Sequence, residues 1–204
     1  MKRLVAATLA FLLLGSMAGC GPAPMVVHSE SESAATPAEP PSSEKTSDQT
    51  KLKDGLTGRE MSPSEVADLS DRLLANDNTI NDQETMARLE LLILKAMKGS
   101  DKTQRPTLWR NLGIIHYHQH KYKQARQELQ AANELNPKSA RTHFYLACLF
   151  AHQGLIYEKN GNKRVSRQQF KRATIEIEQA RKLEPQNSMY KQDPKQFIQQ
   201  GNGK

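Results

Sequence analysis

Residues 107–137 read TLWRNLGIIHYHQHKYKQARQELQAANELNP, and this stretch decides the fold. Gly113 has no side chain, so two helices of a hairpin can approach each other closely at that position. Ala125 and Ala132 are small residues of the kind found where helices cross, and Pro137 would end the second helix. The stretch therefore predicts a helical hairpin with closely packed helices.

Six residues of this stretch have the spacing of a known repeat: Trp109, Leu112, Gly113, Ala125, Leu129 and Pro137. Trp-x2-Leu-Gly, followed by an alanine, a large apolar residue four positions later and then a proline, resembles the tetratricopeptide repeat. One departure is His116, which stands where the family usually has tyrosine, with Tyr117 one residue later. The resemblance implies a repeat over residues 106–139, in a protein that binds other proteins through stacked helical hairpins.

A second, longer repeat is expected over residues 140–187. The small and apolar residues before Pro185 repeat the spacing found before Pro137. These prolines are 48 residues apart, whereas the family period is about 34 residues, so about 14 residues are surplus. Shared between both helices, the surplus adds about two turns to each. With Asn160-Gly161-Asn162 as its turn, this hairpin should protrude from the stack as an elongated arm.

Two repeats rarely bury enough surface alone, and residues 62–101 supply a further pair of helices. Ser62 and Glu65 have the spacing of a capping box, with a proline at the first helical position between them, which predicts a helix start. Asn81, with a glutamate three residues later, predicts the start of a second helix that should run to Lys98. We interpret the pair as a degenerate repeat or an N-terminal cap.

The composition favours an all-α fold, a short solenoid of tetratricopeptide-like hairpins. Aromatic residues make up 5% of the 204 residues, with 11 glycines and 10 prolines. A β-sandwich or barrel would need more turn, aromatic and β-branched residues. Residues 20–61 are rich in serine, glutamate, proline, threonine and alanine, which predicts a disordered linker. Residues 188–204 are polar and predict a short C-terminal helix, covering the end of the stack toward solvent, and a tail.

The N-terminus has the layout of an export signal. Two basic residues precede an apolar run at positions 4–14, which predicts a signal peptide over residues 1–19. Met17-Ala18-Gly19-Cys20 resembles a bacterial lipobox, which implies that Cys20 carries a lipid anchor. Since Gly21 is not aspartate, the resemblance also implies the outer membrane of a Gram-negative host, with the protein facing the periplasm. The alternative is an ordinary secretory signal with Cys20 as a free thiol.

Positive charge gathers on the expected arm. The formal charge is +7, but residues 61–101 carry four basic and eight acidic side chains, while residues 102–204 carry nineteen and seven. Six cations form the candidate binding surface that we name the basic arm: Lys159, Lys163, Arg164, Arg167, Lys171 and Arg172. It would suit an acidic protein segment, an anionic lipid headgroup or a cell-wall polymer. Nucleic acid is not expected, because Phe170 alone supplies an interleaved aromatic ring. The alternative is a charge cluster that only keeps the arm solvated.

A second candidate surface is the groove lined by the first helices of the repeats. Repeats that clamp a C-terminal carboxylate resemble one another in having a basic residue just after the tryptophan and asparagines on the same groove. Arg110 fits the first requirement, but Ile114 and Tyr145 stand where the asparagines would be. These three residues are therefore assigned to a groove for a protein partner, without a carboxylate clamp.

Chemistry on a bound substrate is not expected. The sequence lacks the nucleophile-elbow, zinc-protease, phosphate-loop and dinucleotide motifs, so we predict neither an enzyme nor a cofactor. His116, His118 and His120 are close in sequence, but no carboxylate or cysteine lies beside them, so we interpret them as buried or surface histidines rather than metal ligands. Cys148 lies in an apolar run and fits a small buried residue.

These features predict a lipid-anchored periplasmic adaptor that binds proteins of the cell envelope, in an assembly such as a secretion or pilus machine. The alternative function is electrostatic binding of a cell-wall polymer or an anionic lipid through the basic arm. The identity of the partner and the oligomeric state stay open.

Overall fold

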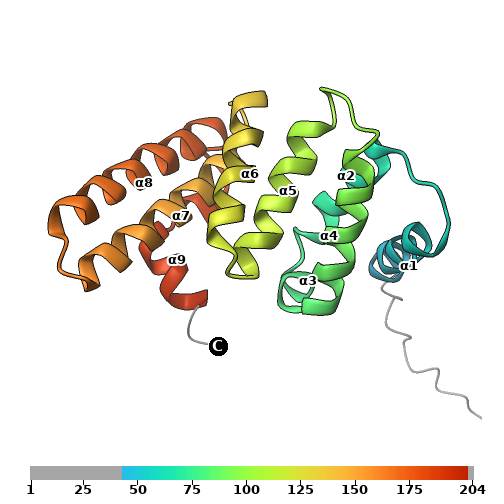
Figure 1. Ribbon diagram of the computed structural model, residues 1–204, viewed down its shortest axis with the longest axis horizontal. Coiled ribbons are helices and arrows are strands. Elements are labelled where there is room, and N and C mark those ends of the chain that lie inside the picture. The colour runs from blue at the N-terminus through green and yellow to red at the C-terminus, as the bar shows by residue number, and fades with distance from the viewer. Residues whose placement is uncertain (1–42, 202–204) are drawn as a thin grey trace, which may run out of the picture. The chain divides into compact units, whose positions relative to one another are not determined.

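The computed structural model describes residues 43–201 of the chain. Over these residues it contains helices and turns and no strand, which confirms the all-α fold. The predicted signal peptide, Cys20 and the first part of the predicted linker lie outside the described residues. The helices are stacked in the order shown in Figure 1: α1 (Ser43–Thr57), α2 (Pro63–Leu73), α3 (Asp77–Asn81), α4 (Gln83–Met97), α5 (Arg105–His118), α6 (Tyr122–Leu135), α7 (Ala140–Lys159), α8 (Lys163–Leu183), the 3-10 helix η1 (Ser188–Lys191) and α9 (Pro194–Gly201).

Helix α1 occupies part of the linker that the composition predicts over residues 20–61. That prediction is wrong for residues 48–57, because this part of the helix packs against α2 and α4. The Leu52 side chain is only 1% exposed. At Gly55 a Cβ atom would lie 2.6 Å from the sulfur of Met61 and 3.1 Å from Leu92. A few apolar contacts to the neighbouring helices thus hold a segment whose composition alone indicates disorder.

Side-chain caps define where α2 and α4 begin. The capping box is confirmed: the Glu65 amide donates to Ser62 Oγ at 3.2 Å, and the Ser62 amide donates to Glu65 Oε2 at 2.8 Å. The cap of α4 is Asp82 rather than the expected Asn81, because Asp82 Oδ1 accepts from the Glu84 amide at 3.1 Å. The side-chain amide of Asn81 donates back to the first residue of α3 at 2.8 Å and is not available as a cap.

Helices α5 and α6 form the hairpin predicted over residues 106–139. A Cβ atom at Gly113 would lie 2.7 Å from Leu129 Cγ and 3.2 Å from the Ala125 carbonyl oxygen, closer than packed atoms normally approach. Ala125 and Leu129 are themselves fully buried. The missing side chain at position 113 therefore sets the separation of the two helices, and the proposed register of the repeat is confirmed.

Helices α7 and α8 form the elongated hairpin. They contain 20 and 21 residues, against 14 in each of α5 and α6. Gly161 in the turn has φ of +75°, in the left-handed region that favours glycine. A second close approach occurs at Gly154, where a Cβ atom would lie 2.6 Å from the ring of Phe170. Figure 1 shows the tip of this hairpin standing clear of α5 and α6.

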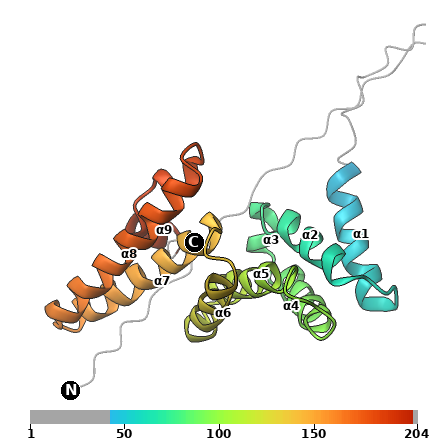
Figure 2. The ribbon, with the colours of Figure 1, turned by 90° about the horizontal axis from the view of Figure 1, so that it is seen from above.

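The C-terminal segment packs more closely than a solvating end helix would. Helix α9 lies against α7, and Figure 2 shows both at the arm end of the stack. Ile198 and Tyr190 are almost fully buried, and the Tyr190 ring lies 5.3 Å from that of Phe144. Lys195 Nζ lies 3.5 Å from the centre of the Phe170 ring. The segment therefore covers the apolar inner side of the arm instead of only facing water.

Substitution of Gly113 by alanine should overpack the crossing of α5 and α6. Because the new methyl group would meet Leu129 Cγ at 2.7 Å, we expect the free energy of unfolding to fall by about 1–3 kcal/mol. Gly99→Ala is the matched control, since the nearest atom to its Cβ would be 3.9 Å away, and it should change stability by less than about 0.5 kcal/mol. Urea unfolding of both variants measures the difference, and equal stabilities would contradict the packing described for Gly113.

Candidate interaction surfaces

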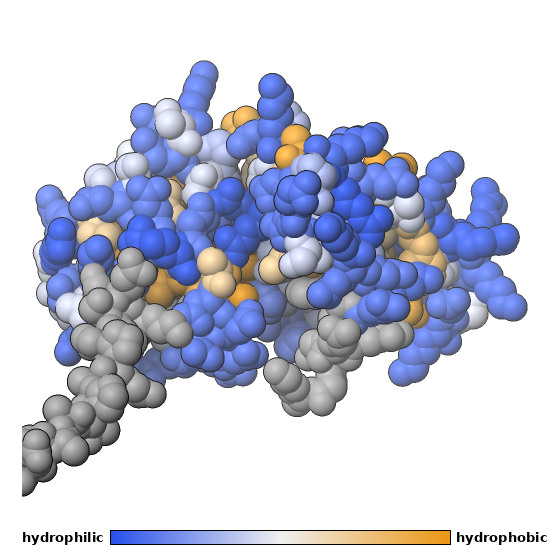
Figure 3. All heavy atoms as spheres, turned by 180° about the vertical axis from the view of Figure 1, so that it is seen from behind, coloured by the Kyte–Doolittle hydropathy of each residue, from blue (hydrophilic) through white to orange (hydrophobic). Residues whose placement is uncertain are grey.

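The basic arm is a solvent-exposed surface. All six of its cations are exposed, one at the end of α7 and five along the first half of α8. None of them forms an ion pair with a residue in the described part of the chain. Hydrophilic side chains project from this end of the molecule in the view of Figure 3. Unpaired, hydrated cations of this kind are available to an anionic partner at little cost in existing contacts.

The groove expected from Arg110, Ile114 and Tyr145 is not formed by these residues as predicted. Ile114 is 0% and Tyr145 is 1% exposed, so neither can contact a partner. The Tyr145 ring packs edge to face against Tyr117 at 5.3 Å, and its hydroxyl lies 3.2 Å from His118 Nε2. Helix α5 is enclosed by α2 and α4 and by α7, which buries Ile114, and Tyr145 of α7 is buried on the side of α7 that packs against α5.

Arg110 does line a hollow of about 520 Å³, between α2, α3, the first turns of α5 and α7, and η1. Its guanidinium is bound by Asp71, with Nη2 2.6 Å from Oδ2. Arg141, at the start of α7, lies 3.9 Å from the same carboxylate and donates to the Leu74 carbonyl oxygen. Both arginines of the hollow thus have an anionic partner within the chain, and a carboxylate that binds them would have to displace Asp71. Lys138, which also lines the hollow, is exposed.

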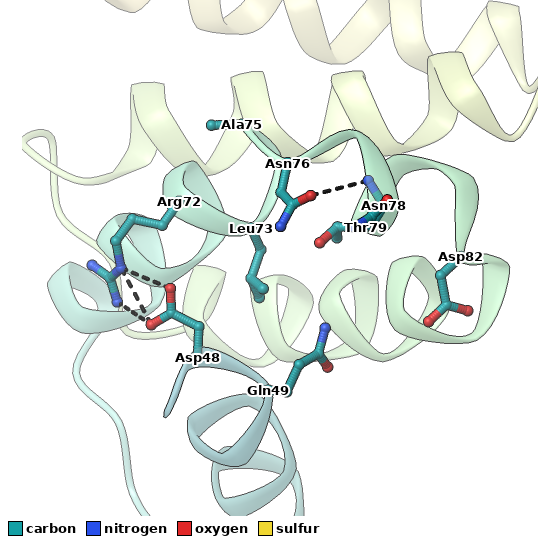
Figure 4. A pocket seen from close by; sticks show the side chains of 9 residues that line it. All are labelled: Asp48, Gln49, Arg72, Leu73, Ala75, Asn76, Asn78, Thr79 and Asp82. Carbon is teal, nitrogen blue, oxygen red and sulfur yellow. Dashed lines mark hydrogen bonds and ion pairs between the residues drawn. The ribbon is translucent and has the colours of Figure 1, made fainter. Parts of the chain in front are cut away.

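A second pocket, of about 450 Å³, lies where α1 meets α2 and α3 (Figure 4). At its edge the Arg72 guanidinium makes a bidentate contact with Asp48, with distances of 3.0 Å from Nε to Oδ2 and 2.9 Å from Nη2 to Oδ1. Asn76 and Asp82, which also line it, are engaged as helix caps. Four polar groups of this pocket are therefore already engaged: Asp48 and Arg72 join α1 to α2, and Asn76 and Asp82 begin α3 and α4.

The sequence did not reveal a third feature, an open cleft of about 410 Å³ between α6 and α8. The guanidinium carbons of Arg126 and Arg172 lie 5.6 and 5.7 Å from the centre of the same ring, that of Phe150. We name this feature the arginine cleft, and its lining residues are Arg126, Gln130, Phe150, Arg172, Ile175 and Glu176. Because the two arginines are on different repeats, no local sequence motif could have brought them together.

The three clustered histidines do not share one site. His116 contacts two carboxylates, with Nδ1 2.6 Å from Glu128 Oε2 and Nε2 3.1 Å from Glu90 Oε1. His118 contacts a tyrosine hydroxyl, and the backbone of His120 turns out of the helix with φ of +60°. The carboxylates beside His116 come from α4 and α6, so they could not be found near it in the sequence. Within residues 43–201 no group of histidine, cysteine and carboxylate side chains is arranged to hold a metal ion.

Two buried histidines have contacts that favour the charged form of the ring. Burial opposes charge on His116, but its hydrogen bonds to Glu128 and Glu90 outweigh this effect and raise its pKa. His143 donates from Nδ1 to Glu176 Oε2 at 2.6 Å and from Nε2 to the Pro137 carbonyl oxygen at 2.9 Å. The bond to Glu176 raises the pKa of His143 despite its burial. Since both nitrogens of each ring face acceptors, each imidazole binds best with two protons.

Cys148 is confirmed as a buried residue. It is 0% exposed, in the middle of α7, and burial raises the pKa of its thiol. A protonated thiol without access to solvent is a poor nucleophile, so the residue contributes to packing rather than to chemistry.

Together, α5–α6 and α7–α8 define a stack of helical hairpins, a class of protein in which extended helix surfaces recognise other macromolecules. Residues 106–139, the span of the α5–α6 hairpin, match the family model of the tetratricopeptide repeat. The match confirms the repeat proposed from Trp109, Gly113 and Pro137, and supports a role in protein–protein interaction. No curated protein matches the chain. Between residues 43 and 201, no helix has both the length and the apolar character required to cross a membrane.

The histidine–carboxylate contacts predict a pH dependence of stability. A raised pKa in the folded state contributes stability that is present below the pKa of the unfolded chain and is lost as the pH rises through the folded value. We therefore expect the free energy of unfolding to fall as the pH rises above about 6.5, by at most about 1.4 kcal/mol per pH unit for each of His116 and His143. Urea unfolding between pH 6.5 and 8.5 measures this slope.

The variant His116→Gln/His143→Gln should show little pH dependence in that range, because glutamine does not titrate. Below pH 6.5 another effect is expected. Burial lowers the pKa of His118 to about 4, so the free energy of unfolding should decrease as the pH is lowered, in the unaltered protein and in the double variant alike. An unchanged slope above pH 6.5 in the double variant would show that the two histidines are not its source.

Proposed function

We propose that the protein is a lipid-anchored adaptor of the cell envelope, which binds a partner protein through the basic arm. The observation that carries the proposal is a row of exposed cations on a helical hairpin that extends beyond the tetratricopeptide repeat, none paired with a described carboxylate. Tetratricopeptide repeats are protein-interaction scaffolds, and the arm adds an electrostatic surface to that scaffold.

The basic arm supports partner binding better than the hollow lined by Arg110 does. In the hollow, Asp71 already binds Arg110 and lies near Arg141, so a partner would gain little new charge pairing with these arginines, and Lys138 is the one other cation that lines the hollow. On the arm the corresponding charges face water and would pair with an anionic partner directly. Apolar anchors are also present, since Ile156 and Tyr157 beside the tip are 45% and 39% exposed.

The envelope location is proposed from the leader sequence. The basic start, the apolar run and Met17-Ala18-Gly19-Cys20 support export followed by lipid attachment at Cys20. Gly21 favours the outer membrane, with the stack facing the periplasm, if the host is Gram-negative. An adaptor in this position would serve an envelope assembly such as a secretion or pilus machine.

A second candidate function is electrostatic binding of a cell-wall polymer or an anionic lipid by the same cations. It is favoured by the density of charge: Lys163, Arg164 and Arg167 follow one another within two turns of α8. Polyanion binding falls steeply with ionic strength, whereas a protein contact that also buries apolar surface falls less. The salt dependence of binding therefore separates the two functions.

Charge reversal on the arm should weaken partner binding without unfolding the protein. For Lys163→Glu/Arg164→Glu/Arg167→Glu we expect stability to change by less than about 0.5 kcal/mol per substitution, since all three side chains are exposed. The control Lys53→Glu/Lys98→Glu/Lys102→Glu makes the same change of charge at exposed sites away from the arm. Affinity capture from detergent-solubilised envelopes should recover less partner with the first variant only. Equal recovery with both variants would exclude the arm as the binding surface.

Lipid attachment is predicted to require Cys20. In cells that express Cys20→Ser and are labelled with a fatty-acid analogue, the protein should carry no label, because Cys148 is buried within α7 and cannot substitute. Cys148→Ser is the control and should be labelled as the unaltered protein is. Label on the Cys20 variant would contradict the lipid anchor while leaving the proposal for the arm untouched.

A further inference from the structure

We propose that the arginine cleft between α6 and α8 binds an acidic peptide segment in which an apolar side chain is flanked by carboxylates. This inference rests on the proposed adaptor function, and it names the chemistry of the partner and a specific place where it docks. The place differs from the groove of the first helices, because the cleft is formed by the second helices of both repeats with Phe150 of α7 between them.

The charge of the cleft comes from two guanidinium groups that approach one aromatic ring. Arg126 and Arg172 lie 5.6 and 5.7 Å from the centre of the Phe150 ring, and neither forms an ion pair with a described residue. Arg126 Nη1 donates a long hydrogen bond, 3.4 Å, to Gln153 Oε1. Both distances are within the range of a cation–π attraction, which favours a position of each guanidinium near the ring and does not use its N–H groups as donors to a carboxylate.

The acidic residue of the cleft does not cancel this charge. Of the lining residues, Glu176 alone has a carboxylate, and its Oε2 is bound by Nδ1 of His143 at 2.6 Å. This contact raises the pKa of His143 and so favours its cationic form, which makes Glu176 the hydrogen-bonded partner of a histidine. The two arginines are left as the net charge that an incoming group meets.

The floor of the cleft is apolar, which selects among anionic partners. Phe150 is 7% exposed, and Ile175, which also lines the cleft, is 50% exposed and so offers apolar surface beside the two cations. A phosphate headgroup or a sugar polymer would leave this apolar surface without a partner. A peptide can place a carboxylate on each arginine and a phenylalanine or leucine side chain over Ile175.

The cleft is also continuous with the basic arm. Arg164, Gln168 and Arg172 are spaced four residues apart on α8, so they lie along one face of the helix. A segment bound in the cleft would meet further positive charge in the direction of the tip. The arm then serves to attract an acidic chain, while the arginine cleft provides the contacts that depend on its sequence.

The test uses the purified full-length protein and three fluorescein-labelled peptides. The probe is GSEEFEESG, with GSQQFQQSG to remove the charge and GSEEAEESG to remove the apolar side chain. We expect fluorescence anisotropy to show binding of the first peptide, several-fold weaker binding of the alanine peptide and no binding of the glutamine peptide. No binding of the first peptide up to about 1 mM would overturn the proposal.

Two variants locate the binding. Arg126→Gln/Arg172→Gln should weaken binding of GSEEFEESG at least about tenfold, because both charge-assisted contacts are lost. Lys98→Gln/Lys102→Gln removes the same charge from exposed positions elsewhere and should leave the affinity unchanged. Arg126→Lys/Arg172→Lys keeps the charge but loses the planar group, and should give an intermediate affinity. Equal affinity in the glutamine and control variants would overturn the proposal.

Vesicles that contain an anionic phospholipid provide the remaining arm of the experiment. If vesicles bind and the peptide does not, and if Arg126→Gln/Arg172→Gln abolishes vesicle binding, then a lipid headgroup occupies the cleft and the proposal is wrong. The peptide assay contains no envelope material. The peptide assay can therefore fail while lipid labelling at Cys20 and envelope capture succeed, or succeed while both of those fail. A failure of this proposal is thus distinguishable from a failure of the proposed adaptor function.

Discussion

The close approach of paired helices is the constraint on which the rest of the structure depends. In each repeat one glycine on the first helix faces a large side chain of the second: Gly113 meets Leu129, and Gly154 meets Phe170. Without these approaches α5–α6 and α7–α8 would pack farther apart, and the contacts of α7 with α6 and α9 would shift with them. Within the described residues the sole cysteine is unpaired, so packing alone maintains this geometry.

Electrostatics divides the described surface into two parts. Near the hollow, acidic side chains of the N-terminal helices neutralise cations of the repeats, as Asp71 does for Arg110. Toward the arm such carboxylates are missing from the sequence between Glu158 and Glu176, and the positive charge stays unmatched. Arginine therefore occurs in two settings: bound to carboxylates that join helices at one end of the stack, and exposed without an ion pair among the described residues at the other.

Local patterns predicted what local interactions determine. The capping box at Ser62 and the hairpin around Gly113 were found because the residues concerned are close in sequence. The length of α7 and α8 followed from the spacing of two prolines. The burial of Ile114 and Tyr145, and the meeting of Arg126 with Arg172, depend on how separate hairpins pack, and no spacing within one hairpin encodes that. Helix α1 was not predicted for the same reason, because Leu52 is buried in the packing of α1 against α2 and α4, and residues near it in the sequence do not indicate this.

The length of the arm has a mechanical consequence. A helix of 20 residues is about 30 Å long, so a force applied at the Gly161 turn acts on the base of the hairpin with considerable leverage. The base is braced on two sides: α9 lies against α7, and Arg181 Nε donates to the Tyr190 carbonyl oxygen at 2.7 Å. His143 adds a tie between α8 and the loop before α7. A force on the tip of the arm would therefore be transmitted to the other helices of the stack, because the contacts at the base of the hairpin resist bending there.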